Sequence, residues 1–307
     1  MTWKPSLSEL ILGFYLVSIT LEFGLSRLAV IKVRYQARDT LAAFGMTLGN
    51  IVTNLMMAGI VIAGLSAAWK LRLFTISPHW PWAWALLFVL DDFTYYWFHR
   101  ISHECRLWWA AHVNHHSSQN YNLSTAMRQT WTGEIVGTWT PWIPLALIGF
   151  PPEMILLQQT INLFYQFWIH TEAVHRMPRW FEYLFNTPSH HRVHHASNPR
   201  YLDRNYAGVL MVWDRLFGTF AQEVVEDPPR YGIIKNIETH NPFRIAFHEW
   251  LAIARDLTTA RSIREAACLL FGPPGWRADG QGTTSRRIRA EWLAKPVEDA
   301  AAGQSQA

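Results

Sequence analysis

The sequence has little of what disulfide-stapled, disordered or nucleotide-binding proteins depend on. Its two cysteines, Cys105 and Cys268, allow at most one disulfide and exclude a metal site built from four thiolates. Charged residues make up only 16% of the 307 positions, which argues against a disordered chain. Neither a glycine-rich phosphate loop nor a dinucleotide-binding fingerprint occurs in the sequence. We therefore expect a folded, apolar protein with no nucleic acid partner.

Long apolar runs dominate the first half of the chain. Half of all residues are hydrophobic, and 17 Trp, 17 Phe and 10 Tyr are among them. A helix needs about 20 apolar residues to cross the hydrocarbon layer of a membrane. Residues 40–69 are uncharged, residues 73–90 are also uncharged, and residues 10–31 carry only Glu22 and Arg27. The sequence therefore predicts three membrane-spanning segments.

A further apolar stretch, residues 135–169, contains one charged residue, Glu153, next to the helix breaker Pro151-Pro152. At about 1.5 Å per residue each half is about 25 Å long. This predicts a tight helical hairpin in the membrane, with Glu134 and His170 emerging on the same face.

The basic residues lie mainly behind the hairpin, where 17 of the 27 Lys and Arg follow residue 171. Because basic segments face the cytoplasm, we expect the rear of the chain on the cytoplasmic side. Residues 244–271 are predicted to form one amphipathic helix that lies on an anionic membrane surface. Residues 280–307, rich in Gly, Gln, Thr, Ser and Ala, are predicted to be a flexible tail.

Histidine is the unusual residue, with 14 copies. Two histidines, His99 and His103, are spaced i,i+4, and the sequence H-x-x-H-H occurs twice, from His112 and from His191. Within each of these sets the histidines share one face of a helix, so their side chains can bind a metal ion. A single histidine ends the hairpin beside them. A lone pair of this kind is usually solvated, but clustered imidazoles without metal would leave buried polar groups or repelling cations. The nine residues are His99, His103, His112, His115, His116, His170, His191, His194 and His195.

Nine nitrogen ligands exceed the four to six that one ion takes, so the pattern predicts two metal ions. Imidazole accepts Zn, Cu, Fe or Ni, and spacing does not choose among them. A site at the membrane boundary, rimmed by aromatic residues, suits an apolar substrate. An apolar hydrocarbon substrate has no group that a metal can hydrolyse. A metal that acts on it therefore needs redox chemistry with O₂, which favours iron.

Four segments carry a resemblance to a known family: residues 91–103, 109–117, 190–195 and 213–219. Together they resemble the fatty acid hydroxylase/sterol desaturase superfamily, whose members are integral-membrane di-iron oxygenases. Within it, the likeness is to the alkylglycerol monooxygenase family, through segments 121–129, 166–172, 186–195 and 205–210. The resemblance covers residues 85–221. It implies an all-α, multi-pass membrane protein whose cytoplasmic helical cap holds two iron ions on the nine histidines.

Further residues receive roles from this resemblance and from their chemistry. His190, just before the last histidine group, is assigned to proton transfer or to orienting a ligand, and His175 is a reserve ligand. Glu104 is expected to accept N–H groups of a tetrahydrobiopterin ring, with a surface glutamate as the alternative. Asp92 lies seven residues before His99 on the same helix face and is expected to orient an imidazole or to pair with Arg100.

Asn122 and Arg128 are expected to shape the pterin or substrate site. Asp214 and Arg215 are expected to form a structural ion pair. The chain then divides into membrane helices at 1–84, a catalytic domain at 85–221 with the hairpin 135–169, an amphipathic region at 222–279 and the tail at 280–307.

The predicted function is O₂-dependent hydroxylation of a lipid C–H bond, with ether-lipid cleavage as one form of it. One alternative is hydroxylation or desaturation of a sterol, carotenoid or fatty acid with ferredoxin or cytochrome b5 as electron donor. A second alternative is a membrane metal transporter. The expected location is a bacterial inner membrane or the endoplasmic reticulum, with the lipid substrate drawn from the bilayer.

Overall fold

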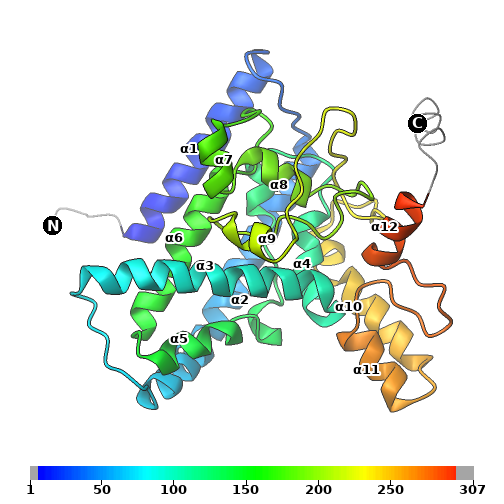
Figure 1. The fold of residues 1–307 in the computed structure, drawn as a ribbon. Coiled ribbons are helices and arrows are strands. Elements are labelled where there is room, and N and C mark those ends of the chain that lie inside the picture. The colour runs from blue at the N-terminus through cyan, green and yellow to red at the C-terminus, as the bar shows by residue number, and fades with distance from the viewer. Residues whose placement is uncertain (1–5, 295–307) are drawn as a thin grey trace.

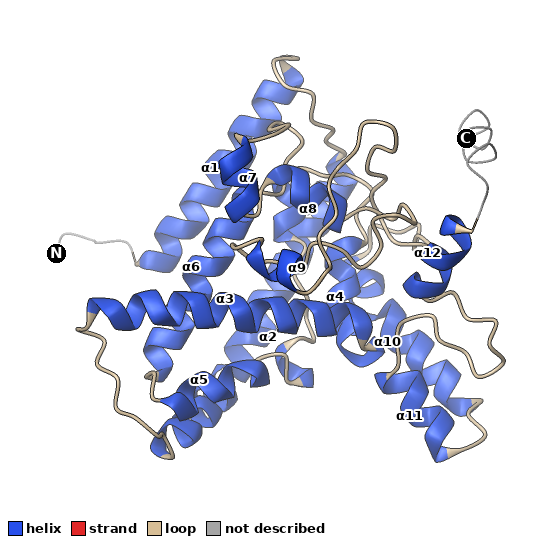
Figure 2. Ribbon diagram, in the orientation of Figure 1, coloured by secondary structure: helices blue, strands red, loops and turns tan. Residues whose placement is uncertain are grey.

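The computed structural model describes residues 6–294, and within this range the protein is helical (Figure 2). Apart from two isolated β-bridges, this range contains no strand. The elements are α1 (Leu7–Arg27), α2 (Ala37–Lys70), α3 (Pro81–Glu104), α4 (Arg106–His116), the 3₁₀ turns η1 (Leu123–Met127), η2 (Glu134–Val136) and η3 (Thr140–Trp142), α5 (Ile143–Ile148), α6 (Pro152–Trp168), α7 (Arg179–Leu184), α8 (Pro188–His194), α9 (Val212–Leu216), α10 (Pro242–Thr258), α11 (Ile263–Phe271) and α12 (Ser285–Leu293).

Two of these helices, α1 and α2, are long and apolar enough to cross a membrane, and most of their residues are not buried in the protein. Helix α1 begins at a capping box in which Ser6 and Glu9 satisfy each other's backbone N–H groups. Apolar side chains that find no protein partner require an apolar solvent, which a bilayer supplies.

The segment predicted as a span from residue 73 is helical only from Pro81, so that part of the prediction is wrong. Residues 71–80 form a loop, and Pro81 occupies the first turn of α3, where its missing N–H costs nothing. Helix α3 is not among the two candidate spans of the described residues. It continues to Glu104 and carries His99 and His103 near its end.

The predicted hairpin is half right. Its second leg is the regular helix α6, but its first leg is a series of short turns, η2, η3 and the six-residue α5. Pro141 and Pro144 interrupt backbone hydrogen bonding there, and Gly137 adopts a left-handed φ of 79°. The short leg packs against α2 through an apolar core that includes Leu65, Phe150 and Ile155.

The rear of the chain also differs from the prediction. The single amphipathic helix expected over 244–271 is two helices, α10 and α11, which lie side by side (Figure 1). Ser262 caps the second one through Glu265 N–H, which explains the break. Within the predicted tail, α12 begins after its cap Thr284, so residues 285–293 are helical. Residues 295–307 of that tail lie outside the described residues.

Helix α1 lies beside α6 (Figure 1), where the Tyr15 and Phe167 rings stack at 4.0 Å between centroids. A buried ion pair, Asp39 to Arg128 at 3.0 Å, joins the start of α2 to the segment behind α4. These contacts fix the apolar helices against the part of the protein that carries the histidines.

Candidate metal centre

The structure brings all nine predicted histidines together in two groups. In each group every member offers one ring nitrogen, and these nitrogens lie within 4.8 Å of one another. The first group, called here the five-histidine group, contains His99, His103, His112, His116 and His194. The second, called the four-histidine group, contains His115, His170, His191 and His195.

Helical spacing explains how four elements build both groups. His99 and His103 lie one turn apart on α3, and helices α4 and α8 each supply an H-x-x-H-H sequence. Neighbouring histidines of α4 and α8 belong to different groups, so each of these helices contributes to both. The His116 and His195 rings, one from each group, stack at 4.4 Å, which places the two groups next to each other.

The distances between ring nitrogens fit metal ligation. The Nε2 atoms of His99 and His112 are 3.0 Å apart, and those of His170 and His191 are 2.9 Å apart. With metal–nitrogen bonds of about 2.1 Å, adjacent ligands of an octahedral ion are separated by about 3.0 Å, against about 3.4 Å for a tetrahedral one. An octahedral ion bound by five or by four of these nitrogens would keep at least one open position.

Backbone carbonyls fix which nitrogen faces the centre. The Nδ1 atom of His99 lies 2.8 Å from the Tyr206 carbonyl, that of His170 lies 2.8 Å from the Gln166 carbonyl, and that of His194 lies 2.9 Å from the Arg204 carbonyl. An Nδ1–H that donates to a carbonyl leaves Nε2 with a lone pair. The Nε2 lone pairs of several imidazoles therefore point toward one another. A cation bound at each group would give these lone pairs a partner.

Burial keeps these imidazoles uncharged. Loss of hydration, and after it the proximity of further imidazoles, lowers the pKa of the six histidines on α4 and α8 well below its ordinary value. Neutral imidazole is the form that binds metal. The six are His112, His115, His116, His191, His194 and His195.

The segment 203–206 orients three members of the five-histidine group. Besides the two carbonyls already described, the Asp203 carboxylate lies 3.7 Å from His103 Nδ1. Asp203 and Asn205 adopt left-handed φ values of 55° and 57°, a conformation that Asp and Asn tolerate better than other side chains. The Asp214 carboxylate holds this backbone by accepting the N–H groups of Tyr206 and Ala207, both at 2.8 Å.

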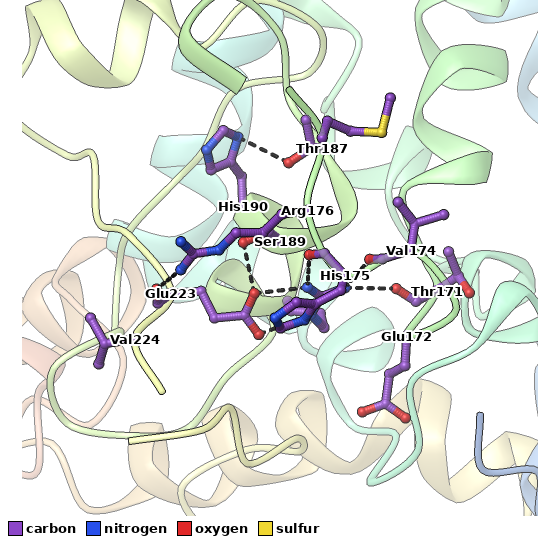
Figure 3. Close-up of polar contacts among 12 residues, drawn as sticks. Thr171, Glu172, Val174, His175, Arg176, Thr187, Ser189, His190, Glu223 and Val224 are labelled. Atoms are coloured by element: carbon purple, nitrogen blue, oxygen red, sulfur yellow. Dashed lines mark hydrogen bonds and ion pairs between the residues drawn. The ribbon is translucent and has the colours of Figure 1, made fainter. Parts of the chain in front are cut away.

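A buried ion pair orients the four-histidine group. Arg192 lies between His191 and His194 on α8 and donates to both Glu223 oxygens, at 3.0 and 2.8 Å. The same guanidinium donates to the carbonyls of Thr171, Val174 and His175, which follow His170 along the chain. Figure 3 shows Glu223 among these residues. Arg192 therefore ties α8 to the segment that carries His170.

The two other histidines of this region lie outside both groups. His175 contributes its backbone carbonyl to Arg192, and its ring is not in a metal-binding group of the described residues. The His190 ring lies against Phe220 and 3.4 Å from Thr187 (Figure 3). Burial, with a smaller effect from Arg215, lowers the pKa of His190 to about 4.

Asp92 and Glu104 make contacts other than those expected. Asp92 accepts the backbone N–H groups of Val209 and Leu210 and the Trp213 indole N–H, so it fixes the loop before α9. Within residues 6–294 it forms no hydrogen bond with an imidazole or with Arg100. Arg100 pairs with Glu104 at 3.0 Å on the surface of α3, the alternative considered for Glu104. Asp214 does not pair with Arg215 in the described residues, because its oxygens bind the 206–207 backbone and Thr219.

Asn122 and Arg128 are buried and already hydrogen-bonded within the protein. The Asn122 side chain caps η1 by accepting from Ser124 and donates to the Arg34 carbonyl. Arg128 donates to Asp39 and to the Asn114 carbonyl. Both residues therefore connect helices around the histidines.

Two cavities reach the histidines, and α3 and α4 contribute residues to both. The first, about 430 Å³ and called here the helix cavity, is lined by α1, α2, α3, α4 and α6 and contacts His112, His115 and His170. The second, about 440 Å³ and called the rear cavity, is lined by the 232–237 loop, α10 and the segment 274–285 that leads into α12. It contacts His103, His116, His194 and His195, and the two cavities share no lining residue.

Sequence reasoning missed Asp203, Arg204 and Tyr206 as orienting residues. Arg204 and Tyr206 act through their backbone carbonyls, which every residue type has. The sequence therefore gave no indication of these two contacts. Asp203 and Asn205 did carry a signal, since an Asp-Arg-Asn run indicates a left-handed turn next to a histidine helix.

A helical chain with nine clustered imidazoles defines a protein with a candidate dinuclear metal centre. Residues 84–219 match the family model for fatty acid hydroxylases, which confirms the resemblance. It is similar to alkylglycerol monooxygenase of Homo sapiens, 37% identical over 264 residues, and of Xenopus tropicalis, 37% identical over 239 residues. It is also similar to ornithine lipid hydroxylase of Rhizobium tropici, 27% identical over 232 residues.

The alignments cover 86%, 78% and 70% of this chain, respectively. The chain spans 58% of the human relative, 52% of the Xenopus relative and 67% of the Rhizobium relative, so it corresponds to little more than half of the alkylglycerol monooxygenases. No solved structure matches the chain.

Proposed function

We propose that the protein is a membrane-bound di-iron monooxygenase that hydroxylates a lipid C–H bond. The two histidine groups are the observation that supports it: five and four neutral imidazoles suit two six-coordinate ions with open positions. When bound, the iron pair supplies activation of O₂. One oxygen atom enters the C–H bond and the other leaves as water, with two electrons and two protons from a reductant.

The chain's own residues position the lipid and hold the imidazoles. We expect the helix cavity to receive the lipid, because the two candidate membrane spans, α1 and α2, line it together with α6. Phe98, Leu163 and Phe167 give it an apolar lining that excludes water from the alkyl chain. The segment 203–206 and Arg192 keep the Nε2 atoms directed at the two ions.

The topology that fits this function is multi-pass, with α1 and α2 spanning the bilayer and the α5–α6 hairpin embedded in it. We expect the histidine groups on the cytoplasmic side, because the Arg-rich rear of the chain favours that side. The domain division at residues 84 and 221 belongs to the same proposal.

The reductant we favour is a tetrahydrobiopterin-type molecule that enters the rear cavity. This cavity contacts four histidines, lies apart from the apolar helices and carries Lys235, His248 and Glu249, groups that bind a polar ring. Its volume suits a small molecule and is too small for a redox protein domain. The side chain of Glu104 does not line it, so we assign pterin binding to the rear cavity.

If the substrate is an ether lipid, hydroxylation beside the ether oxygen gives a hemiacetal. The hemiacetal then breaks its C–O bond and yields an aldehyde and a free glycerol hydroxyl. The names of the alkylglycerol monooxygenase relatives favour this substrate class. The similarity to an ornithine lipid hydroxylase makes a lipid with a different headgroup the alternative.

The test combines metal analysis with turnover. Protein purified without O₂ is expected to contain two irons per chain and, in Mössbauer spectra, a coupled pair. It is expected to consume O₂ only with lipid and reduced pterin present. A single tetrahedral zinc would refute the proposal. Turnover with ferredoxin and its reductase but not with pterin would refute the reductant assignment alone, and metal flux in vesicles without O₂ consumption would favour a transporter.

A further inference from the structure

Helix α10 has one face that is apolar and exposed. Its other face packs against α2 and α4, where Ile245 and Ala246 are buried. The exposed face carries Phe243, Phe247 and Leu251, with 67%, 38% and 63% of their surface exposed. These residues lie four positions apart and therefore form one stripe along the helix, called here the α10 stripe. A continuous apolar stripe of this kind indicates an interaction surface.

The α10 stripe begins at the level where α2 is expected to leave the hydrocarbon layer. Counted back from Trp69, near the end of α2, the roughly 20 residues that cross this layer end at about residue 49. The Trp131 indole packs against the α2 backbone at Gly49, where a Cβ would overlap it. The centroids of the Phe243 and Phe247 rings lie 5.0 and 6.0 Å from that of Trp131. The stripe therefore adjoins the surface of α2 that the bilayer is expected to cover.

Exposed arginines border the α10 stripe. Arg244 and Arg255 share a side of α10 with Leu251, because these positions are separated by seven and four residues. Lys32 and Arg38, just before and at the start of α2, are also exposed. A helix with an apolar stripe and flanking arginines is typical of the lipid headgroup layer, where guanidinium groups bind phosphate. The charge of this surface is therefore complementary to an anionic lipid.

The two carboxylates of α10 do not oppose this charge. Glu249 and Asp256 both pair with Arg106 of α4, and each of the two N–O distances is 2.7 Å. These ion pairs compensate both carboxylates and hold the inner face of α10 on α4. The helix therefore cannot turn its apolar stripe inward, and the stripe stays on the outside.

We propose that the outer face of α10 lies in the headgroup layer of the membrane and binds anionic phospholipid. The two arginines contact lipid phosphates, and the α10 stripe lies among the upper acyl carbons. The structure thereby narrows the surface predicted over residues 244–271 to one face of one helix. None of these five residues lines either cavity, so this lipid surface is separate from the reaction site. Other residues of α10 line the rear cavity, so lipid contact holds one wall of that cavity in place.

The proposal rests on the proposed topology, in which α2 spans the bilayer, and the experiment tests both. A bimane fluorophore is attached to the full chain, in nanodiscs that hold one copy, at Leu251→Cys on the stripe or at Leu55→Cys on the exposed side of α2. The control position is Glu226→Cys, in an exposed loop. The background carries Cys105→Ser and Cys268→Ser, and thermal unfolding checks its fold. The quenchers are acrylamide in water, a nitroxide on the phosphatidylcholine headgroup and a nitroxide deep in the acyl chain.

The three labels are expected to differ in which quencher reaches them. The Leu251 label should be quenched by the headgroup nitroxide and less by acrylamide than the Glu226 label, because an interfacial helix lies about 5–10 Å into the headgroup and acyl boundary. The Leu55 label should be quenched by the nitroxide deep in the acyl chain.

The arginines are expected to give the surface its lipid preference. A contribution of about 1 kcal/mol per arginine corresponds to about fivefold in affinity. Half-maximal quenching of the Leu251 label should therefore need about fivefold less nitroxide-labelled phosphatidylglycerol than phosphatidylcholine for each arginine. The double variant Arg244→Gln/Arg255→Gln should lose this preference. The charge-matched control Arg230→Gln/Arg286→Gln changes exposed arginines outside α10 and should keep it.

Several results would overturn the proposal. If acrylamide reaches the Leu251 label as readily as the Glu226 label, the stripe lies in water. Protection from all three quenchers, in discs with one copy or only in discs with two, identifies protein as the occupant. Equal quenching by the two lipids, or a preference that survives in Arg244→Gln/Arg255→Gln, refutes binding of anionic lipid.

Failure of the topology gives a different result. A Leu55 label that lies in water refutes the span of α2, whatever the Leu251 label shows. If the cysteine-free background does not fold, spin-labelled phosphatidylglycerol and phosphatidylcholine are compared on the chain with both native cysteines. The excess of immobilised phosphatidylglycerol should then disappear in Arg244→Gln/Arg255→Gln, and its persistence overturns the proposal.

Discussion

Replacing Asp214 by Asn is expected to weaken the five-histidine group and spare the other. The Asp214 carboxylate accepts three buried hydrogen bonds, two at 2.8 Å from the Tyr206 and Ala207 N–H groups and one at 2.6 Å from the Thr219 hydroxyl. An amide has one acceptor oxygen, so at least one of them is lost. At about 1.5–3 kcal/mol for each bond to a charged group, the segment 203–206 loses about 2–4 kcal/mol.

That segment carries the carbonyl that fixes His99, and loss of such a contact lowers metal affinity about 10–100-fold. Iron content after dialysis against a weak chelator should therefore fall from two ions per chain towards one. The control is Asp256→Asn, which removes a carboxylate from the Arg106 ion pair at the surface. Retention of both ions at wild-type affinity, or equal loss of both, would refute the idea that segment 203–206 serves one group.

Three further predictions follow from the same contacts. Glu223→Gln should deplete the four-histidine group, because Arg192 then loses its charged partner; iron analysis after chelation checks this. Gly208→Ala should lower stability by about 1–3 kcal/mol in thermal unfolding, since a Cβ there would lie 2.6 Å from Asn162 Oδ1, and an unchanged melting temperature would contradict it. Glu104→Gln should change KM for reduced pterin less than about twofold, because an exposed i,i+4 ion pair contributes little, and a tenfold rise would restore Glu104 to the reductant site.

The histidine site was predictable because its signal is a spacing of residue types. His99 with His103, and the two H-x-x-H-H groups, each fix a helix face, and helical geometry does the rest. The partition into groups of five and four was not predictable. The partition depends on the relative position of α4 and α8 in the folded protein. The spacing of histidines within each helix does not determine this position.

The membrane segments show the opposite limit. The apolar run of α2 predicted a long helix correctly, but the first part of the next uncharged run, residues 73–80, is a loop. Hydropathy indicates whether the side chains of a segment prefer an apolar environment. It does not determine whether the backbone of that segment forms a helix or a loop. The first leg of the hairpin failed for a related reason, because Pro141, Pro144 and Gly137 outweigh its apolar content.

Asp92 has hydrogen-bond partners that its spacing to His99 along α3 did not indicate. Its oxygens bind the loop at residues 209–210, more than a hundred positions away. Long-range backbone contacts of this kind are set by the tertiary fold alone.

In the proposed function, the lipid and the reductant bind in the helix cavity and the rear cavity, and the separate linings of these cavities determine whether the two reactants compete. A molecule in one cavity occupies none of the atoms that hold a molecule in the other. Excess lipid should therefore not displace the electron donor, and initial-rate plots that vary both reactants should intersect without substrate inhibition. Inhibitors shaped to fill one chamber would then act noncompetitively toward the reactant that uses the other.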